Sequence, residues 1–233
     1  MNPTRRLLNF SYLTEVIEEI LVINPYNKIK NPLTSKKSAK MTVDGKTVHG
    51  VDENSKDRNN FKNKYGISKN DLSKKEHDFI KIYTGEGYFP LNEYIRKNIN
   101  KKICEYEWNK ASKLLFGEVA VSFDEALKLR KNIFKKAITL EKDLIVIRKE
   151  KTSALIKYSQ KGIYVSDTLL SVSISKNLDE NKYGKNVNYI LLPKGTKILY
   201  IEKISSTKEE FEILLECGTK LRKIRKTGKY LYH

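Results

Sequence analysis

The chain has 233 residues, of which 39% are hydrophobic, enough for one medium domain with a real core, with or without an N-terminal extension. Its formal net charge of +18 permits nucleic acid, an anionic membrane surface or an acidic protein as partner, and it favours anionic small ligands; the alternative is a lysine-rich surface without a specific partner. Two cysteines exclude the disulfide framework of small secreted domains, and three scattered histidines lack zinc-ligand spacing, so we expect no metal.

The first seventy residues divide into a short helix and a polar stretch. Hydrophobic residues at helical spacing predict an amphipathic helix over residues 7–22: Leu13, Val16, Ile17, Ile20 and Leu21. Acidic residues in the same segment interrupt any signal-peptide core, and no apolar run is long enough to cross a membrane. The polar composition from Asn24 to Asn70 predicts a loop or linker, with a small hairpin around Asp44-Gly45.

Helical signals follow in the next part of the chain. Two capping boxes mark helix starts, one formed by Ser73 with Glu76 and the other by Ser122 with Glu125. The second of these helices is expected to run as far as Ile138. Between the two, Pro90 suits the first turn of a helix that carries Leu91, Tyr94, Ile95 and Ile99, and Trp108 is interpreted as a core residue.

After Glu141 the pattern changes to short apolar strands. These are DLIVIRK, KGIYVSD, LLSVSIS, VNYILLP, TKILYIEKI and FEILLE. Helices first and strands afterwards predict an α+β fold. We expect residues 1–72 to form an N-terminal helix with a basic loop or linker, and residues 73–233 to form the main domain. The basic segment TKLRKIRKTGK near the end is expected to be a last strand with one charged face, for an acidic partner, a nucleic acid or solvent.

A few polar residues interrupt the apolar strands. Arg148 ends LIVIR, Ser171 and Ser173 alternate in LLSVSIS, and Glu210 and Glu212 begin FEILL. Each has an ordinary interpretation as a solvated strand residue. A strand that starts at Glu210 would place both glutamates on one face, about 7 Å apart, where like charges repel unless they are used. The chain has no glycine-rich phosphate loop and no recognisable Ser-His-Asp or Cys-His arrangement.

The order of Arg, then Ser-x-Ser, then Glu-x-Glu resembles the arginine class of mono-ADP-ribosyltransferases, whose signature is a strand-end arginine, an STS strand and an ExE motif. The segments EFEILLECGT and ILLPKGTKILYIEKIS are similar to the ExE strand of that class and to the strands before it. The segment YTGEGYFPLNEYIR resembles a helix motif of the clostridial binary-toxin catalytic domains, in which two tyrosines and an asparagine help to hold NAD. The resemblance covers about residues 73–233.

This resemblance implies an ADP-ribosyltransferase-type fold, with N-terminal helices followed by a mixed, mostly antiparallel two-sheet core. It also implies NAD as a substrate and no metal. Arg148 would bind the pyrophosphate, Glu212 would stabilise the positive sugar formed when nicotinamide leaves, and Glu210 would position or deprotonate an acceptor arginine. Ser171 would fix the rotamer of Glu212. The remaining implied NAD-site residues are Tyr83, Tyr88, Asn92, Ser173 and Tyr183.

Three departures from the family pattern are visible. Val172 replaces the threonine of the STS motif. After that strand the segment NLDENKYGK offers Tyr183, and Lys185 in place of an arginine, for the nicotinamide and phosphate contacts. The loop ISSTKEE has no aromatic residue, although toxins that modify actin carry one there, so actin is not favoured as target.

The sequence leaves several functions open. The first is transfer of ADP-ribose to an arginine of a target protein, by a monomeric, soluble protein that is secreted, injected or delivered by phage and acts in the cytoplasm of a target cell. The second is a basic nucleic-acid-binding or adaptor protein that keeps the fold without the chemistry. Transfer to nucleic acid and simple NAD hydrolysis are intermediate possibilities.

Overall fold

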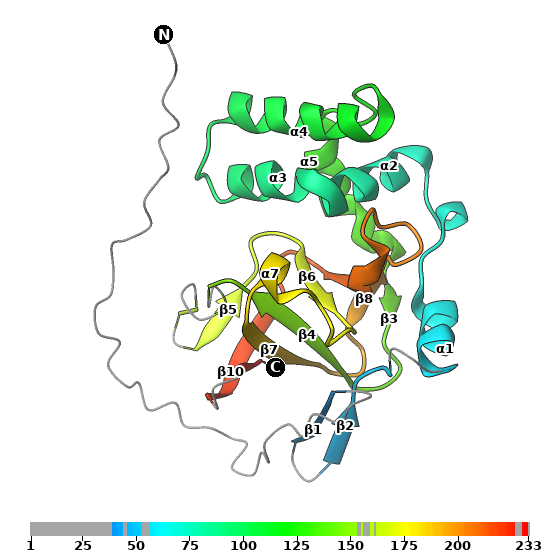
Figure 1. The fold of residues 1–233 in the computed structure, drawn as a ribbon, viewed down its shortest axis with the longest axis vertical. Helices are drawn as coiled ribbons and strands as arrows, with labels where there is room; N and C mark the ends of the chain where they lie inside the picture. Colours follow the sequence, from blue (N-terminus) through cyan, green and yellow to red (C-terminus); the bar gives the residue numbers. More distant parts are fainter. Residues whose placement is uncertain are drawn as a thin grey trace.

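The computed structural model describes residues 39–43, 46–52, 56–152, 155, 159–160, 162–226 and 230–232. The helix predicted over residues 7–22 lies outside these ranges. Figure 1 shows a layer of helices over one side of the strands, with a hairpin at the opposite end. The predicted α+β class is confirmed, and helices precede most of the strands along the chain.

Two paired strands flank the position of the hairpin turn predicted at Asp44-Gly45, which lies outside the described residues, and a helix that the sequence did not predict follows them. Strands β1 (Lys40–Val43) and β2 (Lys46–His49) pair antiparallel. Helix α1 (Lys56–Tyr65) forms where we expected a loop or linker. Its polar sequence is a weak helical signal, but Phe61 and Tyr65, four residues apart, are both buried on one face. The division of the chain at residue 73 stays a prediction.

Both predicted capping boxes are confirmed. Ser73 caps α2 (Lys74–Ile82), and Ser122 caps α5 (Phe123–Asn132), each through the backbone of a glutamate three residues on. The second helix is shorter than predicted. It ends at Asn132, continues as a 3₁₀ turn η3 (Ile133–Lys136), and is followed by the short strand β3 (Ile138–Thr139), because Ile138 pairs with Ile198 of another strand.

The described residues include six further helical elements. They are η1 (Lys69–Asp71), the π-helical turn η2 (Tyr83–Gly87), α3 (Tyr88–Ile95), α4 (Lys101–Phe116) and, later in the chain, α7 (Glu180–Tyr183) and η4 (Lys208–Glu210). Of these, η2, α3 and α4 contribute to a buried core that contains Trp108. Trp108 is fully buried, as predicted, and its indole N–H donates to the Val121 carbonyl at 2.8 Å. Pro90 lies in the first turn of α3, which ends before Ile99.

The predicted strands are all present. Their bounds are β4 (Leu144–Glu150), β5 (Ile163–Val165), β6 (Leu170–Ser173), β7 (Asn186–Leu192), β8 (Lys197–Tyr200), β9 (Glu212–Leu215), β10 (Lys220–Lys226) and the unpredicted β11 (Tyr230–Tyr232). Within the described residues the strand order is β3-β8-β9-β6-β4-β7-β11-β10-β5, antiparallel except where β11 runs parallel to β7.

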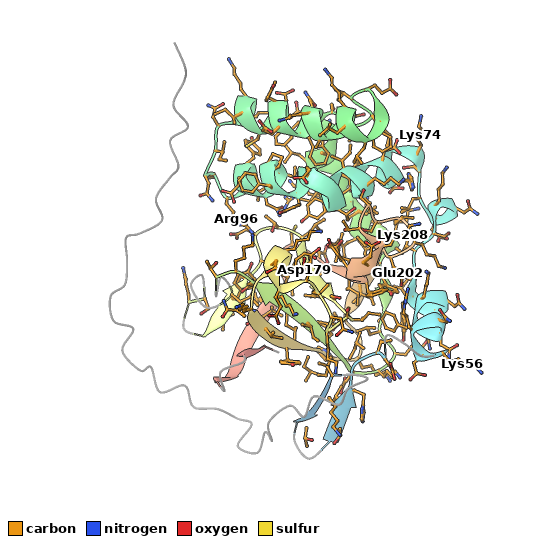
Figure 2. All side chains as sticks on the ribbon, in the orientation of Figure 1. Lys56, Lys74, Arg96, Asp179, Glu202 and Lys208 are labelled. Carbon is orange, nitrogen blue, oxygen red and sulfur yellow. The ribbon has the colours of Figure 1, made fainter. Side chains whose placement is uncertain are left out.

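The strands form two halves that meet at one narrow junction. The β4–β6 pairing consists of a single residue pair, Ile147 with Ser173. On one side of the β8–β9 half, Leu199 and Leu214 pack into the helical core, and on the other side Tyr200 and Ile213 pack into the core shared with β4 and β7. Side chains from the helical layer and from the strands extend into the space between them in Figure 2. The narrow junction lies beside the pocket described next.

Candidate active site

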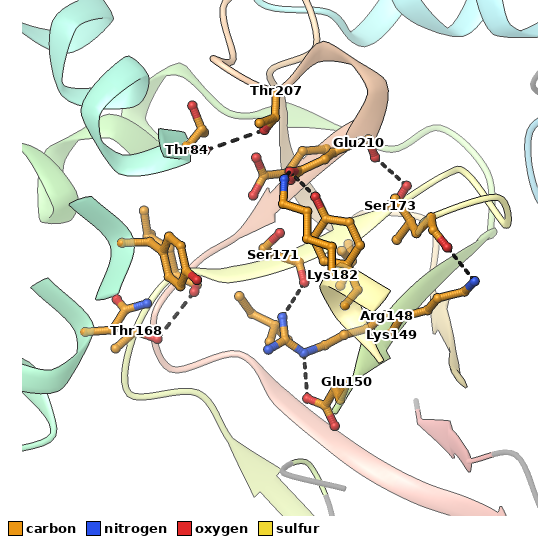
Figure 3. A pocket seen from close by; sticks show the side chains of 18 of the residues that line it. Thr84, Arg148, Lys149, Glu150, Thr168, Ser171, Ser173, Lys182, Thr207 and Glu210 are labelled. Atoms are coloured by element: carbon orange, nitrogen blue, oxygen red, sulfur yellow. Dashed lines mark hydrogen bonds and ion pairs between the residues drawn. The ribbon is translucent and has the colours of Figure 1, made fainter. Parts of the chain in front are cut away.

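A pocket of about 460 Å³ lies between the helical layer and the junction of the two half-sheets. Its volume is in the range usual for small-molecule sites. All the site residues predicted from the sequence line it: Tyr83, Tyr88, Asn92, Arg148, Ser171, Ser173, Tyr183, Glu210 and Glu212. The structure therefore brings together residues from the helices, from β4, from β6 and from the start of β9, as the close-up in Figure 3 shows in part.

Arg148 is held in place by two hydrogen bonds from its guanidinium. Its Nε donates to Oε1 of Glu150 at 2.8 Å, and one terminal nitrogen donates to the Ser171 carbonyl at 2.6 Å (Figure 3). Glu150 is buried and also accepts from the Asn188 amide at 3.2 Å. A guanidinium fixed in this way presents its remaining N–H groups to the pocket with little rotational freedom. Glu150 was not predicted, although its position two residues after Arg148 places both on one strand face.

Glu212 is the most perturbed acid of the pocket. Its side chain is 5% exposed, and Oε2 has no hydrogen-bond partner among the described residues. Burial, followed by the negative charge of Glu210, raises its pKa from the usual 4.5 to about 7, although a hydrogen bond from the Ser171 side chain and the charge of Arg148 act in the opposite direction. A buried carboxylate with an unused oxygen is suited to a cationic ligand group.

Glu210 does not lie on the strand, contrary to the prediction. It ends the 3₁₀ turn η4, and Phe211 adopts a left-handed conformation (φ 47°, ψ 49°) before β9 begins at Glu212. The alternation expected for a strand therefore fails at Glu210, yet Phe211 still packs against the core that contains Ile213. Glu210 in the 3₁₀ turn and Glu212 in the strand both line the pocket, although they lie on either side of this left-handed residue.

Three side chains fix the position of Glu210. The Ser173 hydroxyl donates to its backbone carbonyl at 2.5 Å, the Lys182 ammonium lies 2.9 Å from its Oε1, and the Tyr183 hydroxyl donates to the same oxygen. Ser173 is buried, so in this structure it anchors the turn. Lys182 was missed from the sequence, where Lys185 was considered instead; Lys185 does not line the pocket.

The helical wall of the pocket contributes a tyrosine and an asparagine. The Asn92 amide donates to the Tyr83 hydroxyl, which itself donates to the Leu169 carbonyl, both at 3.3 Å. Burial raises the pKa of Tyr83, so the hydroxyl keeps its proton. The Asn92 Oδ1 has no partner among the described residues and remains an acceptor. Tyr88, by contrast, is 51% exposed and lies at the rim.

The turn before Glu212 is docked onto the same helical wall. The Ser206 backbone N–H donates to the Thr84 hydroxyl at 2.9 Å, and the Ser206 hydroxyl donates to the Lys81 carbonyl at 2.7 Å. The Thr207 hydroxyl lies 3.5 Å from the Thr84 carbonyl (Figure 3). These contacts join the segment ISSTKEE to the end of α2 and to the π-helical turn. Small hydroxyl residues therefore hold this loop, which contains no aromatic residue.

Two negative observations apply to the described part of the chain. No group of three or more His, Cys, Asp or Glu side chains is arranged to hold a metal ion there. Among those residues there is also no helix that is long and apolar enough to cross a membrane.

Comparisons with known proteins agree with this arrangement of fold and pocket. Plx2a, an ADP-ribosyltransferase toxin from Paenibacillus larvae, superposes with a TM-score of 0.54 at 17% identity, over 75% of this chain and 92% of that one. An ADP-ribosyltransferase from Clostridium botulinum gives 0.51 at 18% identity, over 77% and 94%. BECa, an ADP-ribosylating toxin of C. perfringens solved with NADH, gives 0.57 at 16% identity, over 88% of this chain and 55% of that one.

These identities are low, so the superpositions establish the fold alone. No curated protein matches the chain. The sequence model of the ADP-ribosyltransferase exoenzyme family matches residues 58–230, which is most of the chain and includes every residue of the predicted site. The chain therefore belongs to the ADP-ribosyltransferase exoenzyme family.

Proposed function

We propose that the protein is an NAD-dependent mono-ADP-ribosyltransferase that transfers ADP-ribose to an arginine of a target protein and releases nicotinamide. The observation that carries this proposal is Glu212, a buried carboxylate with an unpartnered oxygen, beside Arg148 and Ser171 in one pocket. The fold of BECa, which was solved with NADH, supports a dinucleotide as the ligand.

The roles follow from the chemistry of each group. The fixed guanidinium of Arg148 binds the pyrophosphate. When the bond between ribose and nicotinamide breaks, the bonding electrons leave with nicotinamide and the sugar becomes positive. In its ionised form Glu212 stabilises the transition state more strongly than the ground state, because the positive charge on the sugar develops only as the bond breaks. Ser171, which lines the same pocket, hydrogen-bonds to the Glu212 carboxylate and fixes its orientation for this step.

Glu210 acts on the acceptor. An arginine nitrogen attacks the sugar carbon, and Glu210 orients the guanidinium and accepts the proton that this nitrogen loses. The Lys182 ammonium already pairs with Glu210, 2.9 Å from its Oε1. The guanidinium of an incoming arginine would therefore replace this ammonium as the cation paired with Glu210. Tyr83, Asn92 and Tyr183 complete the NAD site.

Labelled NAD distinguishes this function from its alternatives. The protein is incubated with NAD and with agmatine, a small guanidine, and then with bacterial or animal lysates, and the products are separated. Transfer to agmatine and to a protein band supports the proposal. Nicotinamide release without transfer identifies an NAD glycohydrolase, and label on nucleic acid identifies a nucleic-acid acceptor, which the charge of +18 would suit. Absence of nicotinamide release would favour a binding protein without chemistry.

Two variants assign the roles of the glutamates. Glu212→Gln is expected to abolish both transfer and NAD hydrolysis, whereas Glu210→Gln should remove transfer and leave much of the hydrolysis. Full activity in the double variant would overturn the assignment. Delivery from outside a target cell, by secretion, injection or phage, and action in its cytoplasm as a monomer are part of the same proposal.

A further inference from the structure

Helix α1 contacts the turn that carries the two glutamates at Phe211, a residue that does not line the pocket. The Arg58 guanidinium carbon lies 4.1 Å from the centre of the Phe211 ring. Phe211 is the residue between Glu210 and Glu212, and it has a left-handed backbone that bulky side chains rarely adopt. A residue in such a conformation stays there only when the surrounding structure holds it.

A buried carboxylate fixes Arg58 in turn. Glu202 is 2% exposed, and one of its oxygens accepts from Arg58 and from Lys62, each at 2.8 Å. Its other oxygen accepts from the Tyr200 hydroxyl. Burial acts to raise the pKa of Glu202, but the hydrogen bonds from Arg58, Lys62 and Tyr200 hold it below its usual value, so the carboxylate is charged. Figure 2 labels Glu202 on the side of the molecule where α1 lies.

Backbone hydrogen bonds also connect the end of β8, beside Glu202, to the chain after α1 and to the start of β9. The Ile67 N–H, two residues after the end of α1, donates to the Tyr200 carbonyl at 2.9 Å. The Ile201 N–H donates to the Glu212 carbonyl at 3.0 Å. The helix, the end of β8 and the start of β9 therefore form one connected group, and Arg58 is the side chain that joins its ion pairs to the ring of Phe211.

We propose, on the basis of the function proposed above, that Arg58 is a positioning residue for the acceptor step: by stacking on Phe211 while paired to Glu202, it holds the left-handed turn that aims Glu210 at the acceptor. Glu212 has further support that does not involve Arg58, because β9 pairs with β6 along its whole length, from Glu212 opposite Ser173 to Leu215 opposite Leu170. The effect of losing Arg58 should therefore fall mainly on transfer and much less on NAD hydrolysis.

Lys62 provides a matched control. It pairs with the same oxygen of Glu202 at the same distance and lies on the same helix, but Arg58 is the cation that lies over Phe211. Arg58→Ala should lower the ratio of transfer to hydrolysis about tenfold, the range of a partly buried cation–π contact. Lys62→Ala should leave that ratio unchanged, even if it lowers stability as much as Arg58→Ala does.

Two conservative variants separate stacking from charge. Arg58→Lys keeps a cation for Glu202 but loses the planar group, so it should resemble Arg58→Ala in the ratio. Phe211→Tyr keeps the ring and should retain the ratio, whereas Phe211→Leu should lower it. In the double variant of Arg58→Ala with Phe211→Leu the ratio should fall no further than in the single variants, because both remove the same contact.

Hydrogen–deuterium exchange in the peptide covering residues 208–215 tests the structural part without any NAD chemistry. Exchange there should become faster in Arg58→Ala and stay unchanged in Lys62→Ala. Unchanged exchange in Arg58→Ala, or equal loss of transfer and hydrolysis in it, would overturn the inference. If Glu212→Gln kept full hydrolysis, the proposed function would fail instead, and the exchange result would still decide whether Arg58 holds the turn.

Discussion

Replacement of Glu212 by glutamine should stabilise the fold at neutral and alkaline pH while it removes activity. The Glu212 carboxyl has a pKa of about 7 in the folded protein against an ordinary 4.5, because it is buried beside the charge of Glu210. Between these values the folded protein keeps a proton that the unfolded chain releases. The contribution of protonated Glu212 to the free energy of unfolding is therefore fully present below pH 4.5, and it is lost as the pH rises through about 7.

The size of this effect follows from the same two values. Each pH unit between 4.5 and about 7 lowers the free energy of unfolding by about 1.4 kcal/mol. At pH 8 the ionised carboxylate has therefore lowered the free energy of unfolding by about 3 kcal/mol. Glutamine has nearly the same shape and no charge to bury. The free energy of unfolding of Glu212→Gln minus that of the wild type should therefore increase by about 3 kcal/mol between pH 4.5 and pH 8.

Urea unfolding of both proteins at a series of pH values measures this difference, and the titrating groups that do not interact with Glu212 cancel in it. Glu209→Gln is the control, because Glu209 is the exposed neighbour in the same segment. A difference that stays constant across the pH range would refute the reasoning. In the same range the rate of NAD hydrolysis per enzyme at low NAD should increase with pH through about 7, because the ionised form of Glu212 is the active one.

Four further variants test other parts of the structure. Arg148→Lys should raise the KM for NAD about tenfold or more, since an ammonium cannot keep both guanidinium contacts, and steady-state kinetics would measure this. Glu150→Gln should raise the same KM by a smaller factor, because it loosens Arg148 without removing its charge; an unchanged KM would argue against a positioning role. Lys182→Ala should shift the pH midpoint of hydrolysis upward, because the Lys182 charge lowers the pKa of Glu212, and a pH–rate profile would detect the shift. Trp108→Ala should cost about 3–5 kcal/mol in urea unfolding, and a loss below about 1 kcal/mol would contradict its place in the core.

Much of the site could be predicted because its residues interrupt regular patterns. Arg148, Ser171 and Glu212 are polar residues at fixed places in apolar strands, and strand alternation is a local property that short segments reveal. The capping boxes were found for the same reason, since each one is defined within four residues. Lys182 and Glu150 lacked such a signal of their own. Lys182 pairs with Glu210 and Glu150 accepts from Asn188, partners that the chain brings close only after folding, although Arg148 lies just two residues before Glu150.

The sequence by itself determined the α+β class, the strand segments and the family, because hydrophobic periodicity and motif spacing are written in consecutive residues. Tertiary structure alone decided that a polar segment forms α1, that Phe211 is left-handed, and that Glu210 leaves the strand. The physical reason is the same in each case. Arg58 and Glu202 are 144 positions apart, so no short stretch of sequence reveals their contact. This contact and the burial of Phe61 and Tyr65 outweigh the weak local preferences of the chain.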